Sequence, residues 1–304
     1  MSQAPPTSGT YVCHGVTWAT GDPRLLLAPL PDGPLLYAEI MNQRIGYRAT
    51  GGDRWCTGWY RFTDTHHVEA TACPNGAHAG QSGQCVRCAG RDDFHYAHRY
   101  HQGGPAPEAL AAYMAQPHWL YLATFADGTT KVGTAAEPRK HSRLAEQGAL
   151  VATFLTSSPD GRTVRFLEDA LTRHLGLTQA VRAAAKLNSL AAMSDLAPAQ
   201  LAHKSHLDSA VAALDAMNVT ATPEPWTPPG QGDLLRGAER VLYPHDVREG
   251  EHGLTPVACI GSQVLAALDG DELRYLLDLG ALKGRRLTFG AYTSPSTAVQ
   301  SALF

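Results

Sequence analysis

Side chains suited to phosphodiester cleavage follow one another between residues 118 and 168. Tyr121 precedes a Lys-Val-Gly segment at 131–133 across an Asp-Gly turn, and an acid, Glu168, follows on a segment of helical character. Between them lie basic residues: Arg139, Lys140, His141 and Arg143. Cutting a phosphodiester requires an activated water, a cation against the charge that develops on phosphate, and usually a metal held by a carboxylate. This order of groups predicts a metal-assisted nuclease.

The elements that must position these groups are short and alternate in type. We predict strands over 118–125, 130–134 and 149–156, and helices over 138–147, 161–175, 178–191 and 197–217. Tyr121 and Lys131 then lie on adjacent strands of one hairpin, and Arg139 and Arg143 share one helix face. With Glu168 on the next helix, one common cleft is expected.

Each of these residues also has a purely structural interpretation. A tyrosine on an apolar strand is commonly a core aromatic, and Gly133 can simply end a strand. Helix charges often face water and pair along their own helix, which would join Arg143 to Glu146 or Glu137, and Glu168 to Arg165 or Arg173.

The segment resembles a diverged GIY-YIG nuclease domain. In that family a first motif ends in Tyr, a second ends in Gly, an Arg follows on the next helix, and a Glu on a later helix binds a divalent metal. Tyr121 matches the first position, Gly133 the second, Arg143 or Arg139 the arginine, and Glu168 the metal ligand. The resemblance implies a β-β-α-β-α domain with Mg²⁺ or Mn²⁺ at Glu168.

Two positions depart from the pattern of that family. Lys131 stands where the second motif carries a tyrosine, and Trp119 where the first carries a glycine. A lysine at residue 131 can contact phosphate, or act as a base if its pKa is strongly lowered. The whole chain also resembles an uncharacterised bacterial and archaeal family, a domain of unknown function, in its cysteine cluster, KVG and RLAEQGA segments and Glu168.

Four of the six cysteines fall within one segment that is rich in Gly and His: Cys56, Cys73, Cys85 and Cys88. The last two form a Cys-x-x-Cys, which commonly supplies two of the four ligands of a structural zinc. Because the segment has few apolar residues, metal binding would supply its folding energy. A redox Cys-x-x-Cys is the alternative, and His78 is a substitute ligand. The lone Cys13 and Cys259 are expected to be buried.

Composition and charge limit the class of protein. The 304 residues are 44% hydrophobic and 17% charged, with a formal net charge of −3, which indicates a globular chain and argues against a globally basic nucleic-acid coat. No stretch reaches the ~18 apolar residues that a membrane span requires, and the N-terminus does not resemble a signal peptide. We expect a cytoplasmic protein.

We predict an α+β fold in several parts. Residues 11–104 form an N-terminal β-unit with the four-cysteine zinc site, and 105–219 a GIY-YIG-like domain with extra helices. Residues 220–232 form a proline-rich linker, and 233–304 a small C-terminal β-unit. The expected function is action on nucleic acid, DNA or RNA, by metal-dependent hydrolysis. The alternatives are a non-catalytic nucleic-acid or tRNA-binding module, and an enzyme on a small nucleotide-like metabolite.

Overall fold

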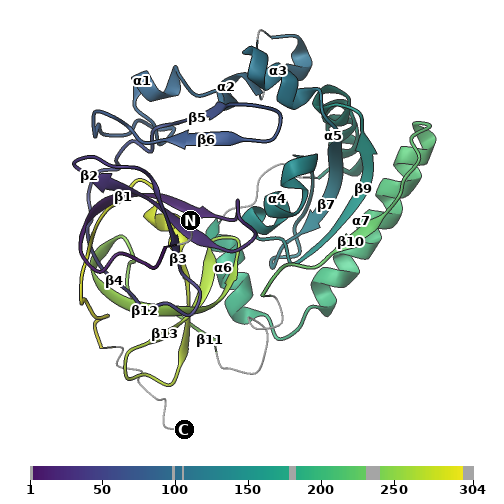
Figure 1. Cartoon of the computed structure of the whole chain (residues 1–304). Coiled ribbons are helices and arrows are strands. Elements are labelled where there is room, and N and C mark those ends of the chain that lie inside the picture. The colour runs from purple at the N-terminus through teal and green to yellow at the C-terminus, as the bar shows by residue number, and fades with distance from the viewer. Residues whose placement is uncertain (1–2, 98–99, 105, 178–182, 231–239, 297–304) are drawn as a thin grey trace.

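The computed structural model describes residues 3–97, 100–104, 106–177, 183–230 and 240–296. Its mixed strands and helices confirm the α+β class (Figure 1). The first five residues of the predicted helix 178–191 lie outside the described residues, as do the end of the predicted linker and the start of the predicted C-terminal unit. Within the described ranges, no helix is both long and apolar enough to cross a membrane.

Strands from the two ends of the chain form one large sheet. The N-terminal strands are β1 (Gly9–Thr17), β2 (Arg24–Leu30), β3 (Leu36–Glu39) and β4 (Ile45–Thr50). The C-terminal strands are β11 (Arg240–Leu242), β12 (Glu249–Ile260), β13 (Gln263–Leu268), β14 (Arg274–Asp278) and β15 (Arg286–Phe289). Their order is β11-β14-β13-β12-β4-β15-β1-β2-β3. Since β4 lies between β12 and β15, the β-units expected at the two ends of the sequence share a sheet rather than stand apart.

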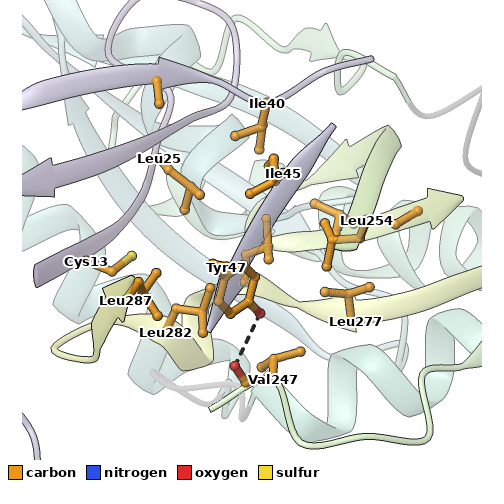
Figure 2. Close-up of a cluster of buried hydrophobic side chains, with 14 of the residues drawn as sticks. Cys13, Leu25, Ile40, Ile45, Tyr47, Val247, Leu254, Leu277, Leu282 and Leu287 are labelled. Atoms are coloured by element: carbon orange, nitrogen blue, oxygen red, sulfur yellow. Dashed lines mark hydrogen bonds between the residues drawn. The ribbon is translucent and has the colours of Figure 1, made fainter. Parts of the chain in front are cut away.

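The large sheet curves around one apolar core. Both of its edge strands contribute, because Ala38 of β3 and Val241 of β11 pack into the same cluster. Tyr47 fills the centre of this core, and its buried hydroxyl donates a hydrogen bond to the Val247 carbonyl at 3.2 Å (Figure 2). The short helix η3 (Leu279–Leu282) contributes Leu279 and Leu282 to the same core. Burying such aliphatic side chains stabilises the fold by about 1.5–3 kcal/mol each.

A second sheet carries the candidate nuclease residues. It contains β7 (His118–Thr124), β8 (Thr130–Ala136), β9 (Val151–Ser158) and β10 (Glu224–Trp226), antiparallel in the order β10-β9-β7-β8. The helical elements of this part are η2 (Glu137–Arg139), α4 (Lys140–Gln147), α5 (Gly161–Leu175), α6 (Ala183–Ala192) and α7 (Ala197–Ala216). Over residues 118–175 the order strand, strand, helix, strand, helix is the one expected from the sequence.

Alternation of side chains divides this sheet into two packed faces. Leu120, Leu122 and Val132 point to the side that α5 and α7 cover. Tyr121 and Ala123 point to the opposite side, where α4 lies between this sheet and the large sheet (Figure 1). The cleavage residues of the hairpin therefore belong to the α4 face.

Local signals fix where the helices begin and end. The Asp160 carboxylate accepts a hydrogen bond from the Thr163 backbone N–H at 2.7 Å, which caps α5. Gly148 ends α4 in the left-handed conformation, with φ of 70°. These caps set the positions at which the two helices leave the sheet, and with them the placement of the charged residues on each helix.

The predicted linker 220–232 contains the edge strand β10. Pro225 is compatible with this strand, because an edge strand leaves one row of N–H groups unpaired. Trp226 packs against the cores of both sheets, and Glu224 accepts an ion pair from Lys140 of α4 at 2.6 Å. This segment therefore ties the two sheets together.

The cysteine-rich region is built from short elements. They are β5 (Trp59–Phe62), β6 (Val68–Thr71), α1 (Val86–Ala89), α2 (Phe94–Ala97), η1 (Tyr100–Gln102) and α3 (Glu108–Met114). Phe62, Tyr113 and Met114 form a small core that reaches Ala136 at the end of β8. The region is thereby joined to the sheet that carries the candidate cleavage residues.

Candidate functional site

The four clustered cysteines converge in space. The sulfur atoms of Cys56, Cys73, Cys85 and Cys88 all lie within 4.8 Å of one another, although up to 32 positions separate them in sequence. A tetrahedral zinc with Zn–S bonds of about 2.3 Å would place its sulfurs about 3.8 Å apart. The donor set therefore fits a closed zinc site that leaves no position for a substrate.

Backbone N–H groups prepare this cluster for thiolates. The Cys56 sulfur accepts hydrogen bonds from the N–H of Cys85 at 3.1 Å and of Gly58 at 3.4 Å. Burial opposes ionisation of Cys85, but hydrogen bonds from the Cys88 backbone and the neighbouring thiols lower its pKa to about 7. Burial raises the pKa values of Cys56 and Cys88, so deprotonation of these two thiols would accompany metal binding.

His78 lies beside the cluster without joining it. Its ring stacks on Trp55 with the centroids 4.4 Å apart, and its Nδ1 lies 3.5 Å from an oxygen of Asp53. The Arg286 guanidinium also lies over Trp55, 3.6 Å from the indole centroid. The substitute ligand considered from the sequence therefore helps to dock the cysteine region on the large sheet.

Tyr121 and Gly133 face each other across the β7–β8 ladder. Tyr121 is only 1% exposed, and its ring occupies the space that a side chain at residue 133 would need. Burial raises the pKa of the Tyr121 hydroxyl, while Arg143 lowers it and Glu168 raises it further. Tyr121 is therefore a core aromatic, in agreement with the structural interpretation of its position. The charges of Arg143 and Glu168 nevertheless influence its pKa.

Lys131 lies on β8, two residues before Gly133 and on the same face of the strand. Its ammonium group donates a hydrogen bond to the Gln147 side-chain oxygen at the end of α4. Burial, with the positive charges of Arg143 and Lys186, lowers the pKa of Lys131 to about 8, and Glu168 opposes this shift. A lysine with such a pKa has a neutral fraction of about a tenth at pH 7.

The two helix arginines interact with different groups. Arg139 makes an ion pair with Glu146 at 2.5 Å, whereas the positive charge of Arg143 lowers the pKa of the Tyr121 hydroxyl against the larger effect of burial. Glu168 pairs with Arg165 of its own helix at 2.8 Å, as the structural interpretation of its sequence position suggested. The charge of Glu168 influences the pKa values of both Tyr121 and Lys131, although its helix α5 packs on the sheet face opposite α4.

Two cavities share Arg139, at the end of η2, and Arg143 of α4 as lining residues. A cavity of about 320 Å³ lies along β8 and is lined by Arg139, Arg143, Arg165 and His118. A second, of about 570 Å³, lies between α4 and the large sheet, and the same Arg139 and Arg143 line it. Both arginines predicted from the sequence therefore line the two cavities.

His118 is a residue whose role the sequence did not indicate. It is 5% exposed, and the 2.8 Å contact between its Nδ1 and the Gln116 carbonyl fixes Nδ1 as the N–H donor. Nε2 is then the acceptor of the ring beside the 320 Å³ cavity. No spacing signal accompanies a histidine at a strand start, so only the fold reveals this placement.

A family model described as "Protein of unknown function (DUF2797)" matches residues 62–224, more than half of the chain. The match runs from β5 to β10 and includes Cys73, Cys85 and Cys88 together with the candidate cleavage residues, but it begins after Cys56. Neither a curated protein nor a solved structure matches the chain.

Proposed function

The chain belongs to the DUF2797 family, and we propose that it acts on nucleic acid by metal-dependent hydrolysis of a phosphodiester. The observation that carries the proposal is that Arg143 lines both cavities beside the central hairpin. Arg143 and Glu168, on two different helices, both act on Tyr121 and on Lys131 of the central hairpin. A likeness to GIY-YIG nucleases, in motif order and in element order, supports the same proposal.

The roles follow from the charges and environments of these side chains. Arg143, shared between both cavities, stabilises the charge that builds on the phosphate in the transition state. Lys131, with its pKa lowered to about 8, takes the proton from the attacking water. Tyr121 does not itself act as a base, since burial raises its pKa.

Glu168 would hold the divalent metal. Its side chain is 16% exposed, and Oε2 accepts a hydrogen bond from Arg165. Oε1 would therefore be the oxygen that binds the metal. Mg²⁺ and Mn²⁺ prefer such oxygens and are commonly held by one or two carboxylates together with water and substrate phosphates. When bound, the metal would supply charge neutralisation at the phosphate. The cysteine-bound zinc would serve as a staple and take no part in the chemistry.

A non-catalytic nucleic-acid-binding module is the second candidate. It is favoured by the contacts that already engage the reactive groups, since Glu168 is paired with Arg165 and Lys131 with Gln147. In that case the arginines bind the phosphate backbone and no bond is cut. The domain would then have the fold of a nuclease without its activity.

The test uses the full chain on branched, single-stranded and duplex DNA and RNA, with Mg²⁺, Mn²⁺ or EDTA. We expect cleavage of at least one substrate that EDTA abolishes. Arg143→Ala should slow it by ~100-fold or more, whereas Arg173→Ala, an exposed arginine near the end of α5, should leave it unchanged. Binding without any cleavage would reject the hydrolysis proposal in favour of the binding module.

A further inference from the structure

The 570 Å³ cavity lies between α4 and the large sheet, and of the candidate cleavage residues only Arg139 and Arg143 line it. It is lined on one side by His14 of β1 and by Lys283 after η3. On the other side lie Arg139 and Arg143, and Tyr60 and Phe94 of the cysteine-rich region complete the wall. Three parts of the chain that are distant in sequence thus build one cavity.

His14 is a buried polar residue in the wall of this cavity. Its side chain is 5% exposed, and among the described residues neither of its ring nitrogens has a hydrogen-bond partner. Leaving a buried polar group unpaired costs about 1–3 kcal/mol, so nearly all such groups in proteins are paired. A neutral imidazole offers one donor and one acceptor. A ligand that pairs with both nitrogens of this ring would therefore carry a hydrogen-bond acceptor and a hydrogen-bond donor.

The charge of the cavity favours an anionic ligand. Arg139, Arg143 and Lys283 line it, and of the described lining residues only Glu146 is acidic. Glu146 is paired with Arg139. Arg143 and Lys283 are therefore the lining cations that Glu146 does not neutralise. The chain as a whole carries a net charge of −3, which makes this concentration of positive charge a local property of the cavity.

Aromatic rings complete the set of groups. Tyr60 and Phe94 meet edge to face, with their centroids 5.5 Å apart, and both line the cavity. Aromatic surface beside cations suits a nucleobase attached to a phosphate. A volume of about 570 Å³ is within the usual range of small-ligand pockets.

We propose that this cavity binds a nucleoside phosphate, either free or as one unit of a single-stranded nucleic acid. Arg143 and Lys283 contact the phosphate, Tyr60 or Phe94 the base, and His14 the polar edge of the sugar or base. The inference rests on the proposed function in naming its substrate class, because Arg143, which contacts the phosphate in that function, also lines this cavity. If the unit belongs to a strand, the cavity along β8 with Arg165 continues the path of its backbone.

Binding is measured by calorimetry on the zinc-loaded full chain without divalent metal. The probes are adenosine monophosphate, a single-stranded DNA of about eight nucleotides, an RNA of the same length, and inorganic phosphate. We expect a nucleotide or a single strand to bind at least ~10-fold more tightly than inorganic phosphate, because stacking on an aromatic ring adds to the phosphate contacts. Tighter binding of an oligonucleotide than of the mononucleotide identifies the strand as the source, and the reverse identifies the free nucleotide.

Two variants locate the binding in the cavity. Lys283→Ala should weaken binding ~10-fold, because a hydrogen bond to a charged group is lost. His14→Leu should weaken binding while leaving the melting temperature unchanged or raised, since no partner of the ring is lost. Lys204→Ala, an exposed lysine on α7, is the matched control and should bind as the wild type does.

Failure of this inference is distinct from failure of the hydrolysis proposal. Wild-type protein that binds neither nucleotide nor strand, or equal binding by wild type, His14→Leu and Lys283→Ala, overturns it. The protein could also bind nucleotide through His14 and Lys283 without cleaving any substrate. That result would support the binding inference and reject the hydrolysis proposal.

Discussion

The ring of Tyr121 covers Gly133 so closely that a methyl group at residue 133 would lie 2.5 Å from both Cζ and Oη of the tyrosine. Only a hydrogen atom fits there, and the two residues are paired on adjacent strands. The glycine of the KVG segment is thus required by the position of the tyrosine ring. The charge of Arg143 in turn lowers the pKa of the tyrosine hydroxyl, against the larger effect of burial.

Replacing Gly133 with alanine should destabilise the protein by about 1–3 kcal/mol, because overpacking forces neighbouring side chains or backbone to shift. Chemical denaturation measures the loss. The control is the same change in a Tyr121→Ala background, where the ring is gone and the added methyl should cost little. Equal costs in the two backgrounds would show that the ring does not constrain residue 133.

The cysteine cluster should bind one zinc ion per chain, measured by elemental analysis of the purified protein. Cys88→Ser removes a ligand and should abolish tight binding and lower the melting temperature, since metal affinity contributes directly to folding. Cys259→Ala is the control, because that buried thiol lies outside the cluster. It should lower stability modestly and keep the zinc. Retention of full zinc content by Cys88→Ser would contradict the site.

Buried His203 should make the protein less stable in mild acid. Its ring nitrogens contact Thr124 and Thr153 at 2.9 and 2.8 Å, and burial, with a smaller effect of His206, lowers its pKa from 6.5 to about 4. Between these two values the unfolded chain binds the proton and the folded chain does not. The contribution of His203 to the free energy of unfolding is therefore fully present above about pH 6.5 and is lost as the pH drops toward 4.

The expected loss from His203 between pH 7 and pH 5 is about 2 kcal/mol. Urea denaturation at both pH values measures it for the wild type and for His203→Asn. The variant starts less stable but should lose less on acidification. His174→Asn, at an exposed position, should show the same pH dependence as the wild type, and an identical slope for His203→Asn would contradict this assignment.

If Lys131 is the base, the cleavage rate should rise with pH and level off above about pH 8. A base acts in its deprotonated form, and burial lowers the pKa of Lys131 to about 8. Lys131→Met should remove this rise together with most of the rate, at little cost to substrate binding. A pH-independent rate in the wild type would exclude Lys131 as the base.

Much of the central domain could be predicted because its signals are local. Turn residues and caps such as Asp160 and Gly148 set element boundaries, and the short spacing between Cys85 and Cys88 indicates metal binding. The pairing of Arg139, rather than Arg143, with Glu146 was beyond such reasoning. It depends on how η2 turns into α4.

Long-range strand pairing could not be predicted at all. Residues of β4 and β12 that pair are about two hundred positions apart, and nothing in the alternation of either strand names its neighbour. The prolines of 220–232 resemble those of a linker, but an edge strand tolerates proline as well. His14 and Lys283 line the 570 Å³ cavity only because strands from the two ends of the chain pair. This cavity therefore could not be predicted from the sequence.

The most direct test of the hydrolysis proposal is the cleavage rate as a function of Mn²⁺ concentration for wild-type protein and Glu168→Gln. The glutamine keeps a hydrogen-bond acceptor for Arg165 but lacks the charge that holds a metal. Glu272→Gln, at an exposed position near β14, controls for loss of a carboxylate. We predict saturable cleavage by the wild type and Glu272→Gln, and a loss of ~100-fold or more in Glu168→Gln. Unchanged, Mn²⁺-dependent cleavage by Glu168→Gln would contradict the account.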